Sequence, residues 1–360
     1  HTAGGARTPI TIYRYDAYDN LVITGTQTVY LYSESLIGSF YLNESGGSPI
    51  TSVQMSEFYF NEADASVAVW YQDTYAGNWK ITASDATPNP DGPTGIRDAE
   101  QYITVLPASA STLAIFRQPS TTATAGTAFG QQPVVHVRDA YGNLIVSDSQ
   151  TQVTASIHSG TGQLLGTRTI TAINGVATFT NLAHQTAETI SIRFTSSPAL
   201  SEVVSGNVTV GHALASRLSI QTQASETATA GVAFSRQPLV HIHDAYGNRV
   251  LNDNTTWVTA SVYSGTGELL GTRAVRAVDG VVSFTNLAHQ TAETLRIGFT
   301  SSPALTEAVS DNIVVVPAAA SRLAVFTQPS TTATVWTPFA IQPVIHVQDQ
   351  FGNRVVDDNT

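Results

Sequence analysis

The sequence predicts an all-β protein made of tandem β-sandwich domains in an elongated rod. The first observation is composition: 42% of the 360 residues are hydrophobic and only 12% are charged. This balance is not typical of a disordered chain, and the abundant threonine and valine suit strands. The second observation is an ungapped internal repeat of 105 residues. That period is the size of one sandwich domain and too long for a solenoid unit.

A five-residue motif marks the repeat. Asp139–Asn143 reads Asp-Ala-Tyr-Gly-Asn and returns unchanged as Asp244–Asn248, then as Asp-Gln-Phe-Gly-Asn over Asp349–Asn353. A related motif, Asp16–Asn20, stands 123 residues before the first of these. Ungapped alignment of residues 111–210 with residues 216–315 gives 63 identities in 100 positions. The repeats are therefore close copies, and the segment before them is a divergent relative.

Within one copy the strands are predicted in order. Turn residues separate short runs that are rich in β-branched side chains, every 8–12 residues, as in a sandwich. Asp244–Asn248 is predicted as a turn, and Asp279-Gly280 as a two-residue hairpin loop. We expect seven strands, at 218–223, 234–243, 257–263, 272–278, 281–285, 295–300 and 312–316.

Four segments are predicted along the chain. Residues 1–106 form a divergent domain that lacks its first strand and begins with its second strand, Ile10 to Tyr15. Residues 107–211 and 212–316 are complete repeats, and residues 317–360 are a partial third repeat. The links near 107, 212 and 317 are short, so each last strand leads almost directly into the next first strand, which favours a rod.

The repeat motifs resemble bacterial immunoglobulin-like (Ig-like) domains of the invasin and intimin type. They are the strand and turn of 135–145, the glycine-rich turn of 160–164, the Asn-Gly-Val-Ala-Thr-Phe run of 174–179 and the run 185–189. The resemblance implies a sandwich fold and an extracellular, cell-surface setting. It implies no particular binding site. Trp336 departs from the pattern, because the other copies have Gly126 and Gly231 there.

Several classes of function are excluded or disfavoured. The formal net charge of −11 argues against a nucleic-acid partner, and no apolar run is long enough for a membrane span. The chain has no cysteine and no recognised catalytic motif, so we expect neither an enzyme nor a cofactor. A metal on the pair His241 and His243 is disfavoured, because the other copies have Arg138 and Gln348 in place of His243. Oxygens such as those of Asp139, Asn143 and Asp148 could bind calcium, although turn capping is the preferred interpretation.

The leading functional prediction is a structural segment of an extracellular bacterial stalk or filament, whose partners are other copies or neighbouring surface proteins. One alternative is an adhesin that binds a glycan or a protein through aromatic side chains of the first domain. These are Tyr13, Tyr15, Tyr30, Tyr32, Trp70 and Trp79. Another alternative is a spacer in a large secreted enzyme.

The incomplete terminal segments have two explanations. The preferred one is that the sequence is a window on a longer repeat protein, and the other is strand exchange between chains. A strand from the last segment of one chain would fill the open edge of the next chain's first domain, which would build a head-to-tail filament. The residues proposed for that strand are Leu323, Val325, Phe326, Val344 and Val347.

Overall fold

The computed structural model describes residues 1–25, 27–50, 55–60 and 66–356, and only the backbone of residues 55–60. Every regular element in these ranges is a β-strand, which confirms the predicted all-β class. The search of the described residues for a long, apolar helix of membrane-spanning type finds none. Two compact units are present. One holds His1–Thr121, Ala128–Ala183 and Thr189–Val208, and the other holds Thr122–Thr127, His184–Glu188 and Thr209–Thr360.

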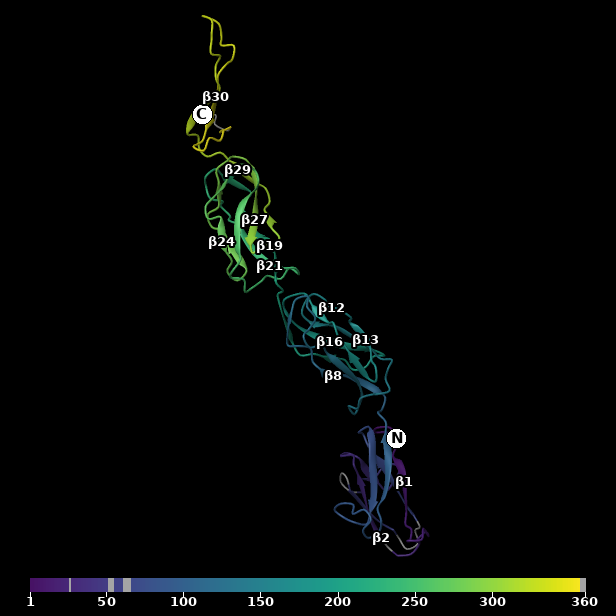
Figure 1. The fold of residues 1–360 in the computed structure, drawn as a ribbon. Coiled ribbons are helices and arrows are strands. Elements are labelled where there is room, and N and C mark those ends of the chain that lie inside the picture. Colours follow the sequence, from purple (N-terminus) through teal and green to yellow (C-terminus); the bar gives the residue numbers. More distant parts are fainter. Residues whose placement is uncertain (26, 51–54, 61–65, 357–360) are drawn as a thin grey trace. The chain divides into compact units, whose positions relative to one another are not determined.

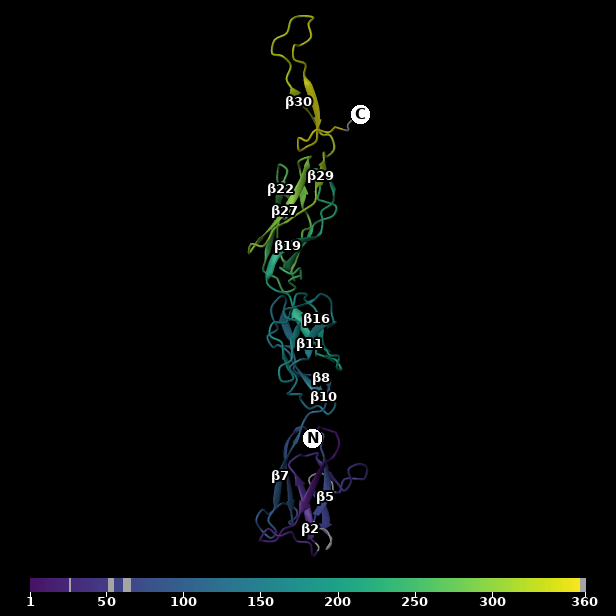
Figure 2. The same cartoon turned by 90° about the vertical axis from the view of Figure 1, so that its right-hand side faces the viewer.

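The second repeat shows the architecture most completely. One sheet has the order β19-β21-β25, and the facing sheet has the order β20-β29-β27-β22-β24. Figure 2 shows β22 beside β27, and Figure 1 shows β19 with β21. All pairs are antiparallel except β20 with β29, which is parallel. The bounds are β19 Ala215–Thr222, β20 Thr227–Thr229, β21 Leu239–Asp244, β22 Trp257–Ser264, β24 Ala274–Arg276, β25 Val281–Ser283, β27 Thr294–Ser302 and β29 Ile313–Val316.

This strand order is that of an Ig-like sandwich. The first strand, β19, pairs with β21 in one sheet. The chain then crosses to the other sheet, where β20 runs parallel to the last strand, β29. Both sheets contribute side chains to one core, in which Ile242, Val258, Ile297 and Phe299 are fully buried. The fold class is therefore confirmed by the strand topology itself.

All seven predicted strands of this repeat exist, with altered ends. The second begins at Leu239 and not at Phe234, because Pro238 has no N–H to donate to a ladder. The Asp279-Gly280 hairpin is confirmed: both residues have positive φ, 50° and 70°. Four short strands were not predicted: β20, β23 (Leu269–Leu270), β26 (Ala288–His289) and β28 (Ala308–Val309).

The first repeat keeps the same order, β14-β10-β8 in one sheet and β13-β11-β16-β18-β9 in the other. Two further short strands, β12 and β15, pair with each other, and β17 pairs with β16. The bounds are β8 Ala110–Arg117, β9 Thr122–Thr124, β10 Val134–Asp139, β11 Gln152–Ser159, β12 Leu164–Leu165, β13 Thr169–Thr171, β14 Val176–Thr178, β15 Ala183–His184, β16 Thr189–Ser197, β17 Val203–Val204 and β18 Val208–Gly211.

The first domain has sheets β1-β5-β3 and β4-β2-β6-β7. Its first strand is β1, which spans Thr8–Tyr13 and not Ile10 to Tyr15 as predicted. Within the described residues β1 pairs only with β5, whereas β21 pairs on both edges. Before β1, Thr2 forms a parallel bridge with Leu106, as β20 does with β29. The other bounds are β2 Gln27–Ser33, β3 Ser39–Tyr41, β4 Met55–Phe60, β5 Ser66–Gln72, β6 Gly77–Ser84 and β7 Ala99–Val105.

In the last segment β30 (Arg322–Thr327) pairs with β31 (Val344–Gln348) as a two-stranded sheet. Residues 357–360 of this segment lie outside the described residues. The four predicted domain ranges stay predictions, since the two compact units follow a different division.

Candidate functional site: a repeated junction

The five-residue motif forms a self-bonded turn, which we call the junction turn. In Asp244–Asn248, the Oδ1 atom of Asp244 accepts hydrogen bonds from the backbone N–H of Tyr246 at 2.9 Å and of Asn248 at 2.8 Å. The Nδ2 atom of Asn248 donates to the Oδ2 atom of Asp244 at 2.8 Å. Gly247 has φ 92°, a conformation that favours glycine. These bonds hold the asparagine side chain in one orientation.

The asparagine of each junction turn binds a loop that lies earlier in the chain, within the same compact unit. Asn248 Nδ2 donates to the carbonyl oxygen of Gln185 at 2.8 Å, and its Oδ1 accepts from the N–H of Ala187 at 2.8 Å. We call residues 185–187 the acceptor loop. A carboxamide offers a donor and an acceptor side by side, which an aspartate cannot do.

The same clamp closes two other junctions. Asn353 donates to the carbonyl oxygen of Gln290 at 2.8 Å and accepts from the N–H of Ala292 at 2.7 Å. In the first unit Asn143 donates to the carbonyl oxygen of Thr74 at 2.8 Å and accepts from the N–H of Ala76 at 2.9 Å. The acceptor loop therefore comes from a divergent sequence in one case, because the bonds use its backbone only.

The aspartate of each turn also binds the linker. Its Oδ2 atom accepts from the backbone N–H of the linker residue at 2.8–2.9 Å. The pairs are Asp139 with Ala108, Asp244 with Ala213 and Asp349 with Ala318. One carboxylate thus joins the turn to the connecting segment, and charge assistance makes such bonds stronger than neutral ones.

The aromatic ring of each turn packs on a glycine that lies earlier in the chain, within the same compact unit. A Cβ atom on Gly126 would overlap the ring of Tyr246, and one on Gly231 would overlap the ring of Phe351. Gly4 stands in the same relation to Tyr141. All three glycines have positive φ, between 61° and 77°. Only glycine meets both demands, positive φ and room for a ring.

A buried His–Glu pair braces each repeat's acceptor loop. His184 Nε2 lies 2.9 Å from Glu188 Oε1 on either side of residues 185–187, and His289 lies 2.9 Å from Glu293 likewise. Both histidine side chains are 0% exposed. The carbonyl oxygens of these histidines accept from the N–H groups of Gly126 and Gly231, so loop and glycine are held together.

Electrostatics follow from this geometry. Burial alone would raise the pKa of Asp244, but hydrogen bonds from Asn248, Ala213 and Tyr246 outweigh burial and lower that pKa below its ordinary 3.8. The pKa values of Asp139 and Asp349 are lowered by corresponding bonds. The carboxylates are therefore ionised at neutral pH and act as acceptors.

Sequence analysis found the junction turns but not what they contact. The preferred interpretation, turn capping, is confirmed for Asp139, and Asp148 likewise accepts from the N–H groups of Gln150 and Thr151. Gly126 and Gly231, on which the rings pack, could have been found from the sequence, because they recur 105 residues apart. Trp336 stands at the third equivalent position. Trp336 has φ 63° and is fully exposed.

The six aromatic candidates belong to both sheets of the first domain. Tyr13 and Tyr15 lie together, half exposed, with ring centroids 6.3 Å apart. Tyr30 and Tyr32 point from β2 on the side opposite the buried Leu31. The remaining two are half-buried: Trp70 lies in β5, and Trp79 in β6 stacks on Tyr75 and donates to its carbonyl oxygen.

A hollow of about 630 Å³ adjoins the first pair. Tyr13 and Tyr15 line it together with Arg14, Arg97 and Ile96. Aromatic rings beside charged donors and acceptors are the chemistry with which proteins hold amphipathic polar ligands. The other four aromatic candidates do not line this hollow.

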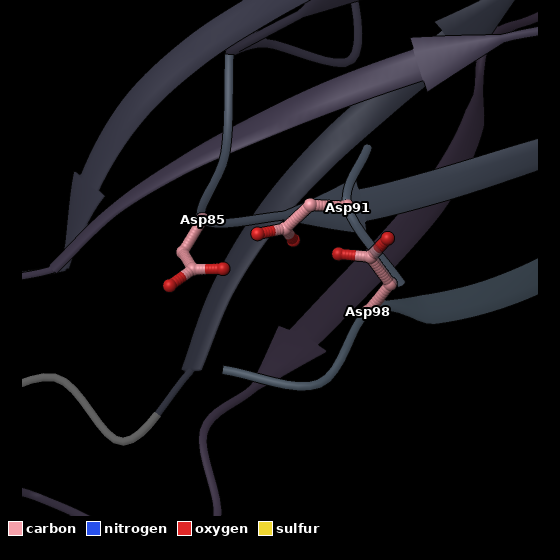
Figure 3. A group of neighbouring side chains, drawn as sticks. All are labelled: Asp85, Asp91 and Asp98. Atoms are coloured by element: carbon pink, nitrogen blue, oxygen red, sulfur yellow. The ribbon is translucent and has the colours of Figure 1, made fainter. Parts of the chain in front are cut away.

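Three carboxylates that sequence analysis missed converge nearby, as Figure 3 shows: Asp85, Asp91 and Asp98. Their oxygens lie within 4.8 Å of one another. One oxygen of Asp98 accepts from the N–H of Gly92 at 2.7 Å, and one of Asp85 accepts from the N–H of Ile96 at 3.1 Å. Calcium prefers oxygen ligands of this type. Calcium binding stays a prediction, and these residues differ from those that the sequence suggested.

The residues proposed for an exchanged strand lie in β30 and β31. Leu323 pairs with Val347, and Val325 pairs with Ile345, within one chain. Leu323, Phe326 and Val344 are exposed. Strand exchange between chains stays a prediction.

Comparison with known proteins returns fold likenesses only. No protein-family model matches the chain, and no curated relative does. Among solved structures it is similar to invasin, described as a bacterial integrin-binding protein, with 12% identity, a TM-score of 0.32, and 91% of this chain and 61% of that chain covered. It is similar to InvD of Yersinia pseudotuberculosis, with 15% identity, a TM-score of 0.36, and coverages of 87% and 94%. It is also similar to the D0-D1 domains of intimin, with 15% identity, a TM-score of 0.22, and 57% of this chain and 98% of that chain covered. The types named from the sequence motifs are thus among the structures that this chain resembles.

We expect Asn248→Ala to loosen one junction without unfolding either domain. Two hydrogen bonds contribute about 1–3 kcal/mol together, so the amide of Ala187 should exchange with solvent about 5- to 150-fold faster. Hydrogen exchange followed by NMR measures this. Asn254→Ala is the matched control, because Asn254 bonds only within its own repeat. Equal exchange in both variants would contradict the junction's role.

We expect the stabilising effect of Asp244 to vanish in acid. A folded-state pKa below 3.8 means that the contribution is present above pH 4 and is lost as pH falls through the lowered value. The difference in melting temperature between the wild type and Asp244→Asn should therefore be constant from pH 7 to about pH 5 and shrink below about pH 4. A difference that grows in acid would show that the sign is wrong.

Proposed function

We propose that this chain is a structural segment of an extracellular bacterial surface protein, in which consecutive Ig-like modules are joined by stiff junctions. The observation that carries the proposal is the repetition of one set of bonds at three places. Each junction has the same asparagine clamp, the same aspartate–linker bond and the same aromatic ring on glycine.

The physical argument begins from the default behaviour of linked domains. Modules on a linker move relative to one another unless an interface prevents it. The clamp contributes about 1–3 kcal/mol, which shifts the ratio of closed to open junctions by about 5- to 150-fold. Stiffness of this kind is needed by a stalk or filament that holds its outer end away from a surface.

Spin labels test this proposal directly. The chain has no cysteine, so labels can be attached at Thr171→Cys and Thr259→Cys in consecutive repeats. Double electron–electron resonance should give one narrow distribution of the distance between the two labels when no other residue is changed. The combined variant Asn143→Ala, Asn248→Ala and Asn353→Ala should broaden it, while Asn254→Ala should not. A distance distribution that is already broad before the asparagines are changed would contradict the proposal that the junctions are stiff.

A second function, glycan binding by the first domain, is favoured by the hollow beside Tyr13 and Tyr15. Saccharides present apolar ring faces and hydroxyl groups, which suit the two neighbouring tyrosine rings beside Arg14 and Arg97. A glycan array probed with the full chain should give signals that Tyr13→Ala with Tyr15→Ala abolishes. Tyr102→Ala, which removes an exposed tyrosine of β7, is the control. Signals that survive the double change, or none at all, would leave only the structural role.

A further inference from the structure

The first domain carries a fourth copy of the junction turn. In Asp16–Asn20, Asp16 Oδ1 accepts from the N–H of Tyr18 at 2.9 Å and of Asn20 at 2.8 Å. Asn20 Nδ2 donates to Asp16 Oδ2 at 3.0 Å. Asp19 has φ 63° in the place that glycine takes in the repeats. These distances equal those of the three engaged turns to within 0.2 Å.

This turn is poised like the others but contacts no acceptor loop within the described residues. The ring of Tyr18 is 86% exposed, against 51%, 47% and 37% for Tyr141, Tyr246 and Phe351. In the described part of the chain, every hydrogen bond of the Asn20 side chain goes to Asp16. The Oδ1 atom of Asn20, which would accept from an acceptor loop, has none there. The exposed tyrosine and the pre-oriented carboxamide are the two side chains with which the three engaged turns contact their glycine and their acceptor loop.

We propose that Asp16–Asn20 is the docking surface for a further Ig-like module. That module would present a backbone carbonyl and N–H two residues apart, as in residues 290–292, with a glycine at positive φ beside them. An intact second copy of this chain does not fit, because its acceptor loops at 74–76, 185–187 and 290–292 are already engaged by its own asparagines. The inference extends the proposed structural role to a fourth junction.

A spliced chain supplies the partner in register. Thr2 bridges Leu106 in parallel just as Thr229 pairs with Val316, so Thr2 corresponds to Thr229 and, one repeat later, to Thr334. Joining residues 1–334 to residues 3–360 therefore places the module 212–316 ahead of the first domain. It also provides β30 as the neighbour that β1 lacks. The acceptor loop 290–292 of the leading part then faces the turn Asp16–Asn20 of the trailing part.

The expected result is protection of the Ala292 amide in the leading part of the spliced chain. Asn20→Ala in the trailing part should raise its hydrogen exchange about 5- to 150-fold, the range for two lost bonds. Asn43→Ala, at another exposed position of the same domain, should leave it unchanged. Exchange at Ala292 that Asn20→Ala does not alter would overturn the proposal.

Asn248→Ala in the same spliced chain distinguishes failure of the docking surface from failure of the proposed structural role. If Asn248→Ala speeds exchange at Ala187 but Asn20→Ala has no effect at Ala292, the fourth junction fails and the structural role stands. If neither has an effect, both fail.

A second measurement covers a spliced chain that does not fold. The full chain, labelled with ¹⁵N, is mixed at millimolar concentration with an unlabelled full chain that carries Phe351→Ala and Asn353→Ala, which frees the loop 290–292. Linked domains reach effective concentrations of this order. Shifts confined to the amides of residues 16–20 support the docking surface, and unchanged spectra overturn it.

Discussion

The arrangement of each junction depends on one interaction, the asparagine carboxamide that binds the acceptor loop. It works because its orientation is settled before the neighbouring domain is met: Asp244 and the backbone of its own turn hold Asn248 in place. A pre-oriented side chain loses little conformational entropy when it binds, so two ordinary hydrogen bonds are worth nearly their full value. Around that bridge the aspartate binds the linker, and the aromatic ring of the turn packs on the glycine.

The junction also explains why two separate segments of the first repeat recur unchanged in the second repeat. The junction turn and the run Asn181–Thr189 belong to opposite ends of a sandwich, and the run is identical in 286–294. The first engages the domain before it, and the second is engaged by the domain after it. The acceptor at 74–76 shows that the asparagine clamp uses backbone groups and needs no particular side chain in the acceptor loop.

Trp336 marks the limit of this scheme. It keeps the positive φ of Gly126 and Gly231, but it carries a Cβ atom, and a Cβ atom at either glycine would overlap the aromatic ring that packs there. A junction turn cannot dock there as it does on glycine. Module joints of one chain can therefore differ in stiffness through a single residue.

The sequence by itself determined the all-β class, the 105-residue period, the seven main strands and the self-bonded turns, because strand propensity, turn chemistry and repetition are local or periodic properties. It also named the aspartates and asparagines correctly as turn-forming residues. Only the tertiary structure decided what those residues contact, since Asn248 and Gln185 are 63 positions apart and no periodicity relates them. It likewise decided that Tyr13 and Tyr15 share a hollow while Trp70 and Trp79 lie elsewhere, because adjacency across sheets depends on packing and register. The grouping of Asp85, Asp91 and Asp98 has the same origin: loop geometry, which carries no repeating pattern, brings them together.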